Sequence, residues 1–178
     1  MKNPRTARLA LLLSVLGTFS LFGAALAQSA APPAITPPAG NTLLVSAFGT
    51  GIQIYRSQLV GGTYHWVFVC PTATLFTEKS EVTVLATHFA GPSWQDVLDG
   101  SVVAGKVAAS APSPTPGAIP QLLLTAKSHR GAGLLSQVSY IQRINTVGGT
   151  APSTAPTLPG QEADVPYTAT YNFYAPMK

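Results

Sequence analysis

The chain has 178 residues, only 9% of them charged, and contains 16 glycines and 16 prolines. Three of its ten Lys and Arg residues lie among the first eight positions. The other seven basic residues stand against six acidic ones, so the rest of the chain has a net charge of about +1. Because those seven are scattered, the composition excludes the clustered basic surface that nucleic-acid binding requires.

The first 27 residues have the parts of a cleavable signal peptide. Basic residues open the chain, residues 9–22 are apolar and uncharged, and Ala25-Leu26-Ala27 forms a small-x-small cleavage site. The uncharged stretch of residues 9–27 is also long enough for a membrane anchor, but it ends in small residues and no basic cluster follows. We therefore predict cleavage before Gln28, no membrane span after cleavage, and a secreted or periplasmic protein.

Residues 28–40 are rich in Pro and Ala and predict an extended, mobile tether without core-forming residues. Residues 41–178 then form a single domain that is long enough to bury a core. Cys70 is the only cysteine, so no disulfide can form within the chain. Packing alone has to stabilise the domain.

The first β-rich segments predict a hairpin. Residues 52–59 and 64–70 are rich in β-branched and aromatic residues and flank Gly61-Gly62. The second run is apolar on both of its faces, which predicts a central strand that is buried on both sides and ends at Pro71. Cys70 shares a face with aromatic residues of this strand, so we expect an inert core thiol.

The remaining chain continues this pattern of short strands. Residues 119–128 form either a strand or a short helix, for which Pro120 suits the first turn. About six or seven short strands predict an all-β, mainly antiparallel sandwich or barrel with at most one short helix. The other predicted strands are residues 82–89, 101–108, 135–144 and 165–174, with turns at Gly91-Pro92 and Asp99-Gly100 and loops over 110–117 and 147–160.

Five strings spread along the chain resemble those of a known family. They are GIQIY (51–55), HFAGPSWQDVLDGSVV (88–103), IPQLLL (119–124), VSYIQRINTVGGTAP (138–152) and VPYTATYNFY (165–174). Together they resemble the DUF3455 family, which comprises exported bacterial and fungal proteins of unknown function. The resemblance covers nearly the whole mature chain and implies an exported domain without an assigned activity.

The chain departs from that family in its cysteines. The family usually has a cysteine two residues after the tyrosine of GIQIY, where this chain has Ser57, and another in the segment that here is 153–160, which has none. Both are absent together, as expected if they normally pair. Some members carry a malate dehydrogenase label, but the Gly-x-Gly-x-x-Gly fingerprint and the βαβ pattern are missing here. We therefore reject that label for this chain.

The densest group of chemically active side chains is His88, Trp94, Asp96 and Asp99. A histidine and two carboxylates suit a divalent metal or an acid/base pair, although no H-x-H or H-E-x-x-H spacing is present. Alternatively, Asp99 caps the Asp-Gly turn, Asp96 is solvated and His88 is a partly buried strand residue. Trp94 is either a stacking platform for a sugar or a plug at one end of the β core.

A second candidate site lies where Arg143 and Asn145 lead into Gly148-Gly149. This junction suits an anion, or else the arginine holds loop carbonyls together. No Gly-x-Ser-x-Gly elbow occurs, and the sequence leaves the cofactor unknown. Two hypotheses remain: a non-enzymatic module that binds a small ligand, a glycan or an envelope partner, and a hydrolase or metal-dependent enzyme that uses His88 with Asp96 or Asp99. The lack of a catalytic motif favours the first.

Overall fold

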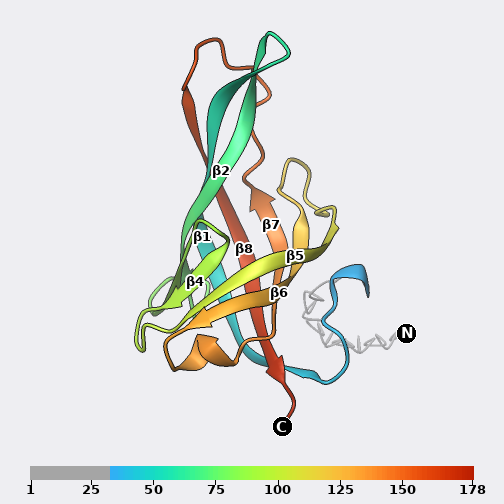
Figure 1. The fold of residues 1–178 in the computed structure, drawn as a ribbon, viewed down its shortest axis with the longest axis vertical. Helices are drawn as coiled ribbons and strands as arrows, with labels where there is room; N and C mark the ends of the chain where they lie inside the picture. Colours follow the sequence, from blue (N-terminus) through green and yellow to red (C-terminus); the bar gives the residue numbers. More distant parts are fainter. Residues whose placement is uncertain (1–32) are drawn as a thin grey trace, which may run out of the picture. The chain divides into compact units, whose positions relative to one another are not determined.

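The structure, a computed structural model, describes residues 33–178, and the predicted signal peptide lies outside them. Each of the eight strands is antiparallel to the strands that precede and follow it in the chain, and β8 pairs with β1 to close a barrel (Figure 1). The strands are β1 (Asn41–Val60), β2 (Thr63–Phe76), β3 (Val84–Phe89), β4 (Ser93–Asp96), β5 (Val102–Ala111), β6 (Gln121–Arg130), β7 (Tyr140–Gly148) and β8 (Glu162–Pro176).

The predicted all-β antiparallel class is confirmed, and of the two predicted architectures the chain adopts the barrel. The helices among residues 33–178 are the short 3-10 helices η1 (Pro33–Ile35) and η2 (Leu134–Gln137). The ambiguous segment is a strand, in which Leu124 packs into the main core and its neighbour Leu123 into a second cluster. Apolar side chains therefore lie on both faces of this strand, which is why the sequence showed neither a clear strand periodicity nor a clear helix periodicity. No helix of the described part is long and apolar enough to cross a membrane.

The predicted first hairpin is confirmed and joins β1 to β2. Val60 pairs with Thr63 across Gly61 and Gly62, whose φ angles are 59° and 87°. Positive φ at both central positions is what a two-residue hairpin turn with the twist of its strands requires. Figure 1 shows that this hairpin extends well beyond β3 to β6.

The strand β2 differs from its predicted form. It continues through Pro71 to Phe76, because β3 pairs with it only from Ala73 onward and a proline is tolerated where a strand has an open edge. For the same reason the strand is not buried on both sides: Phe68 is 48% exposed. Cys70 is only half-buried, so its prediction as a core thiol was wrong.

A β-bulge next to Cys70 re-orients this part of the hairpin. Ile54 pairs with Cys70 and Tyr55 with Phe68, so Val69 has no partner. An extra residue on one strand shifts the alternation of its side chains. Phe68 therefore faces the same side as Tyr55, and their rings meet edge to face with centroids 5.7 Å apart.

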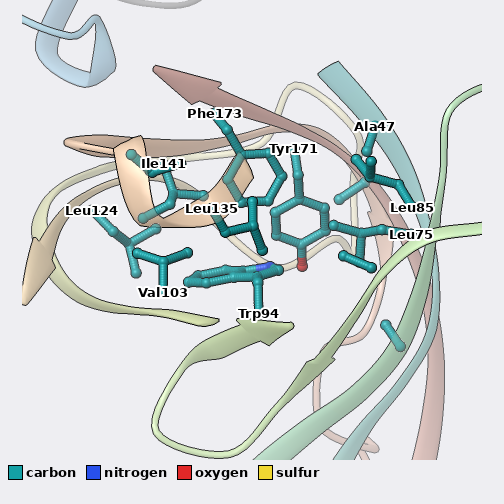
Figure 2. Close-up of a cluster of buried hydrophobic side chains, with 14 of the residues drawn as sticks. Ala47, Leu75, Leu85, Trp94, Val103, Leu124, Leu135, Ile141, Tyr171 and Phe173 are labelled. Atoms are coloured by element: carbon teal, nitrogen blue, oxygen red, sulfur yellow. The ribbon is translucent and has the colours of Figure 1, made fainter. Parts of the chain in front are cut away.

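The main core of the barrel packs around large aromatic side chains. Tyr171 and Phe173 on β8 are fully buried. Figure 2 shows the Trp94 indole among these rings and aliphatic side chains such as Val103 and Leu124. Gly49 makes room for this packing, because a Cβ there would lie 2.7 Å from the Tyr171 ring.

The segment before β1 is bound to the barrel rather than free. Ile35 in η1 is fully buried in a second cluster with Ala111, Leu123 and Ile144, and its carbonyl accepts a 2.7 Å hydrogen bond from Gln142 Nε2. The tether expected over residues 28–40 is therefore anchored at Ile35. Composition concealed this contact, because Ile35 is the single large apolar residue of an otherwise Pro/Ala-rich segment.

Candidate functional site

A cavity of about 420 Å³ lies inside the barrel. Side chains from all eight strands line it, and most of them are apolar or aromatic. Phe68 and Val107 are about half exposed, so these two mark its opening to solvent. The lining residues are Gln53, Tyr55, Phe68, Val69, Cys70, Pro71, His88, Gly91, Pro92, Trp94, Val107, Ile119, Pro120, Leu122, Leu124, Arg143 and Tyr171.

His88 and Trp94 form one wall of the cavity. They sit directly opposite each other on β3 and β4, so their side chains share the inner face. Their rings stack with centroids 4.4 Å apart and an angle of 3° between the planes. Trp94 thus lies on a short strand that the sequence had not predicted, and it is 1% exposed.

The protonation of His88 follows from its surroundings. Its Nδ1 lies 2.9 Å from the carbonyl oxygen of Ser93, which can only accept, so Nδ1 carries the hydrogen and Nε2 the lone pair. Burial lowers the pKa of His88 to about 4, and the hydrogen bond to Ser93 opposes this while the Arg143 charge adds to it. The ring is therefore neutral at pH 7.

The two aspartates do not join His88 at the cavity. Asp96 was expected to be solvated, but it is 3% exposed, and its Oδ1 accepts hydrogen bonds from the backbone N–H groups of Leu98 and Asp99, at 2.7 and 3.1 Å. Asp99 caps its turn by accepting from the N–H of Ser101 at 2.8 Å, and it also accepts from Leu134 at 2.7 Å. Hydrogen bonds from these two residues lower the pKa of Asp99. Both carboxylates hold backbone in place.

Arg143 extends from β7 into the cavity wall, whereas Asn145 does not reach it. The Arg143 Nη2 donates a 2.9 Å hydrogen bond to the carbonyl of Pro120, so the arginine does hold a loop carbonyl. Its Nε is buried and has no partner. Asn145 has a positive φ of 52° at an irregularity of β7 and bonds through Nδ2 to Thr170 Oγ1 at 3.3 Å.

Three residues that line the cavity each have a side-chain nitrogen that is shielded from it and has no hydrogen-bond partner: Gln53 Nε2, Trp94 Nε1 and Arg143 Nε. Buried polar groups are nearly always bonded, so three such donors around one cavity are unusual. Sequence reasoning missed Gln53, although a glutamine inside the β-branched GIQIY string was a detectable signal. It also missed Tyr171, which pairs with Arg143 across β7 and β8.

The described residues contain no group of three His, Cys, Asp or Glu side chains that would hold a metal ion. The family model described as "Protein of unknown function (DUF3455)" matches residues 38–175. The chain belongs to the DUF3455 family. The match runs from just before β1 almost to the end of β8, so it covers every strand that lines the cavity. The chain matches no curated protein and no solved structure.

Proposed function

We propose that this DUF3455 domain is a non-enzymatic binding module that holds a small organic ligand inside its barrel. The observation that carries the proposal is the mostly apolar cavity of about 420 Å³, whose lining includes a few polar side chains such as Gln53, His88 and Arg143. Small-molecule sites combine a mostly apolar concave surface with a few placed polar groups. Eight-stranded barrels also have an interior of the width that holds one small ligand.

The placement of the ionisable groups supports binding rather than catalysis. The carbonyl of Ser93 orients His88 and leaves Nε2 free, but no carboxylate of residues 33–178 lines the cavity beside it. Burial also lowers the pKa of His88 to about 4, which makes it a weak base. Asp96 and Asp99 bond to backbone N–H groups of their own turn and of η2. The alternative hydrolase or metal-dependent enzyme therefore has no support from these positions.

Binding of a neutral fluorescent probe tests the proposal. N-phenyl-1-naphthylamine is apolar and brightens when it leaves water, so titration should give saturable binding to the intact protein. Val107→Trp should obstruct the opening and weaken binding by about tenfold or more. Val147→Trp is the matched control, because both valines are 50% exposed and Val147 does not line the cavity.

Two outcomes would contradict the proposal: the absence of saturable binding, and equal binding by wild type and Val107→Trp. Thermal unfolding of both variants would verify that the substitutions leave the barrel folded.

We also propose that the module works outside the cytoplasm, in the periplasm or beyond the cell. The support is the signal-peptide pattern of residues 1–27. The intact mass of exported protein should correspond to a chain that starts within two residues of Gln28. A mass that retains the first 27 residues would contradict this proposal.

A further inference from the structure

We infer that the ligand of this cavity is a small organic anion with an apolar body, whose negative group is held by the guanidinium of Arg143. The inference rests on the proposed binding function and names the chemical class of the ligand.

The first step is the charge of Arg143. In residues 33–178 the one salt bridge joins Arg56 to Glu162, two well-exposed side chains. Arg143 has a neutral carbonyl as its hydrogen-bond acceptor and no carboxylate partner. Arg143 is half-buried, so its charge has lost part of its contact with water without gaining an opposite charge. An anionic ligand would supply the missing counter-charge.

The second step is the polarity of the other free groups. Gln53 and Trp94 are 3% and 1% exposed, and their side-chain N–H groups are shielded from the cavity. The phenolic groups of Tyr167 and Tyr171 bond to each other at 2.9 Å, and hydrogen bonding from Gln53 to Tyr167 and from Arg143 to Tyr171 favours the charged form of each phenol. Arg143 is thus the lining side chain that offers a charged donor to the cavity, which a ligand can satisfy only with acceptor atoms.

The third step is the electrostatic field within the barrel. The positive charge of Arg143 acts on His88, Tyr55 and Tyr171, where it opposes protonation of the imidazole and favours the charged form of each phenol. These side chains come from different strands, so the charge is felt around the cavity wall. A neutral His88 adds no second cation, and Arg143 alone sets the sign of this field.

The packing of Trp94 speaks against a glycan. One face of the indole is covered by the His88 ring, and Tyr171 and Phe173 meet it edge to face at 5.9 and 6.0 Å. Sugars bind tryptophan through an open ring face, and this indole, which is 1% exposed, has none. The aliphatic part of the wall, which includes Leu122 and Leu124, suits a hydrocarbon or aromatic body.

Two probes that share one scaffold test the inference. 8-Anilinonaphthalene-1-sulfonate differs from N-phenyl-1-naphthylamine by its sulfonate group, so the ratio of their affinities isolates the effect of the charge. The wild-type protein should bind the sulfonate at least about tenfold more tightly, the effect of one charge-assisted hydrogen bond. Raising the salt concentration should weaken binding of the sulfonate and leave binding of the neutral probe unchanged.

Variants then test which residue provides the positive charge that favours the sulfonate. Arg143→Met should abolish the preference for the sulfonate while the neutral probe binds as before, and Arg143→Lys should keep part of the preference. Lys106→Met is the control, since it removes one exposed positive charge outside the cavity. Val107→Trp should weaken both probes.

The outcomes separate this inference from the proposed function. If the neutral probe binds in the cavity but the sulfonate has no advantage, or Arg143→Met and Lys106→Met have equal effects, the anion inference fails and the binding function stands. If neither probe responds to Val107→Trp, both fail. Should Arg143→Met not fold, the Arg143→Lys variant and the salt dependence of wild type decide, because a salt-independent ratio overturns the inference.

Discussion

The buried imidazole of His88 should make the stability of the barrel depend on pH. The pKa of this histidine falls from 6.5 to about 4 on folding, mainly because burial disfavours its charged form. Between these two values the unfolded chain binds a proton that the native protein does not. The free energy of unfolding therefore rises with pH in this window. The part of it that depends on a neutral His88 is lost as the pH falls from 6.5 towards 4.

The size of the effect follows from the two pKa values. The interval from about 4 to 6.5, at about 1.4 kcal/mol per pH unit, corresponds to about 3 to 4 kcal/mol. Asp99 does not interfere, because its pKa lies below 3.8 in the folded protein. The stability that it contributes is lost only as the pH falls below that window.

Urea unfolding of wild type and His88→Asn at several pH values from 4.5 to 7 would measure this dependence. Asparagine keeps an N–H that can donate to the Ser93 carbonyl but does not titrate. We expect a less stable protein at pH 7, because the stack on Trp94 is lost, and a nearly flat response to pH. His65→Asn, which removes an exposed imidazole, should keep the wild-type slope. An unchanged slope in His88→Asn would refute the reasoning.

Three further changes probe the cavity and its supports. Trp94→Ala should lower the free energy of unfolding by about 3–5 kcal/mol, since a fully buried indole is removed; a loss below about 1 kcal/mol in urea unfolding would contradict its role in the core. Cys70 should react with a neutral maleimide in the native protein, because it is half-buried in the cavity wall, and saturating N-phenyl-1-naphthylamine should slow the reaction. Labelling that requires unfolding would show a closed cavity. Ile35→Ala should cost about 2–4 kcal/mol, whereas a free tether would show no change in melting temperature.

Local sequence patterns were enough for the elements whose geometry is set by neighbouring residues. Gly61-Gly62 predicted the first hairpin because two adjacent residues with positive φ are required there. The β-rich residues 165–174 predicted the last strand, which the structure extends over Glu162–Pro176. His88 and Trp94 were grouped by their closeness in sequence, and the turn between them does bring their rings together.

The structure also separated residues that the sequence had grouped. Asp96 and Asp99 are close to His88 along the chain, yet their carboxylates are occupied by backbone N–H groups of their own turn. The closeness of two aspartates in a sequence does not show which N–H groups their carboxylate oxygens bond to.

The cavity itself could come only from the closure of the barrel. Gln53, Trp94 and Arg143 lie on β1, β4 and β7, and no local pattern relates strands so far apart in the chain. Pairing of β8 with β1 places all eight inner faces around one space. Whether that space is filled or left open depends on the combined volume of side chains from every strand, which is a property of the folded barrel and not of any segment of the sequence.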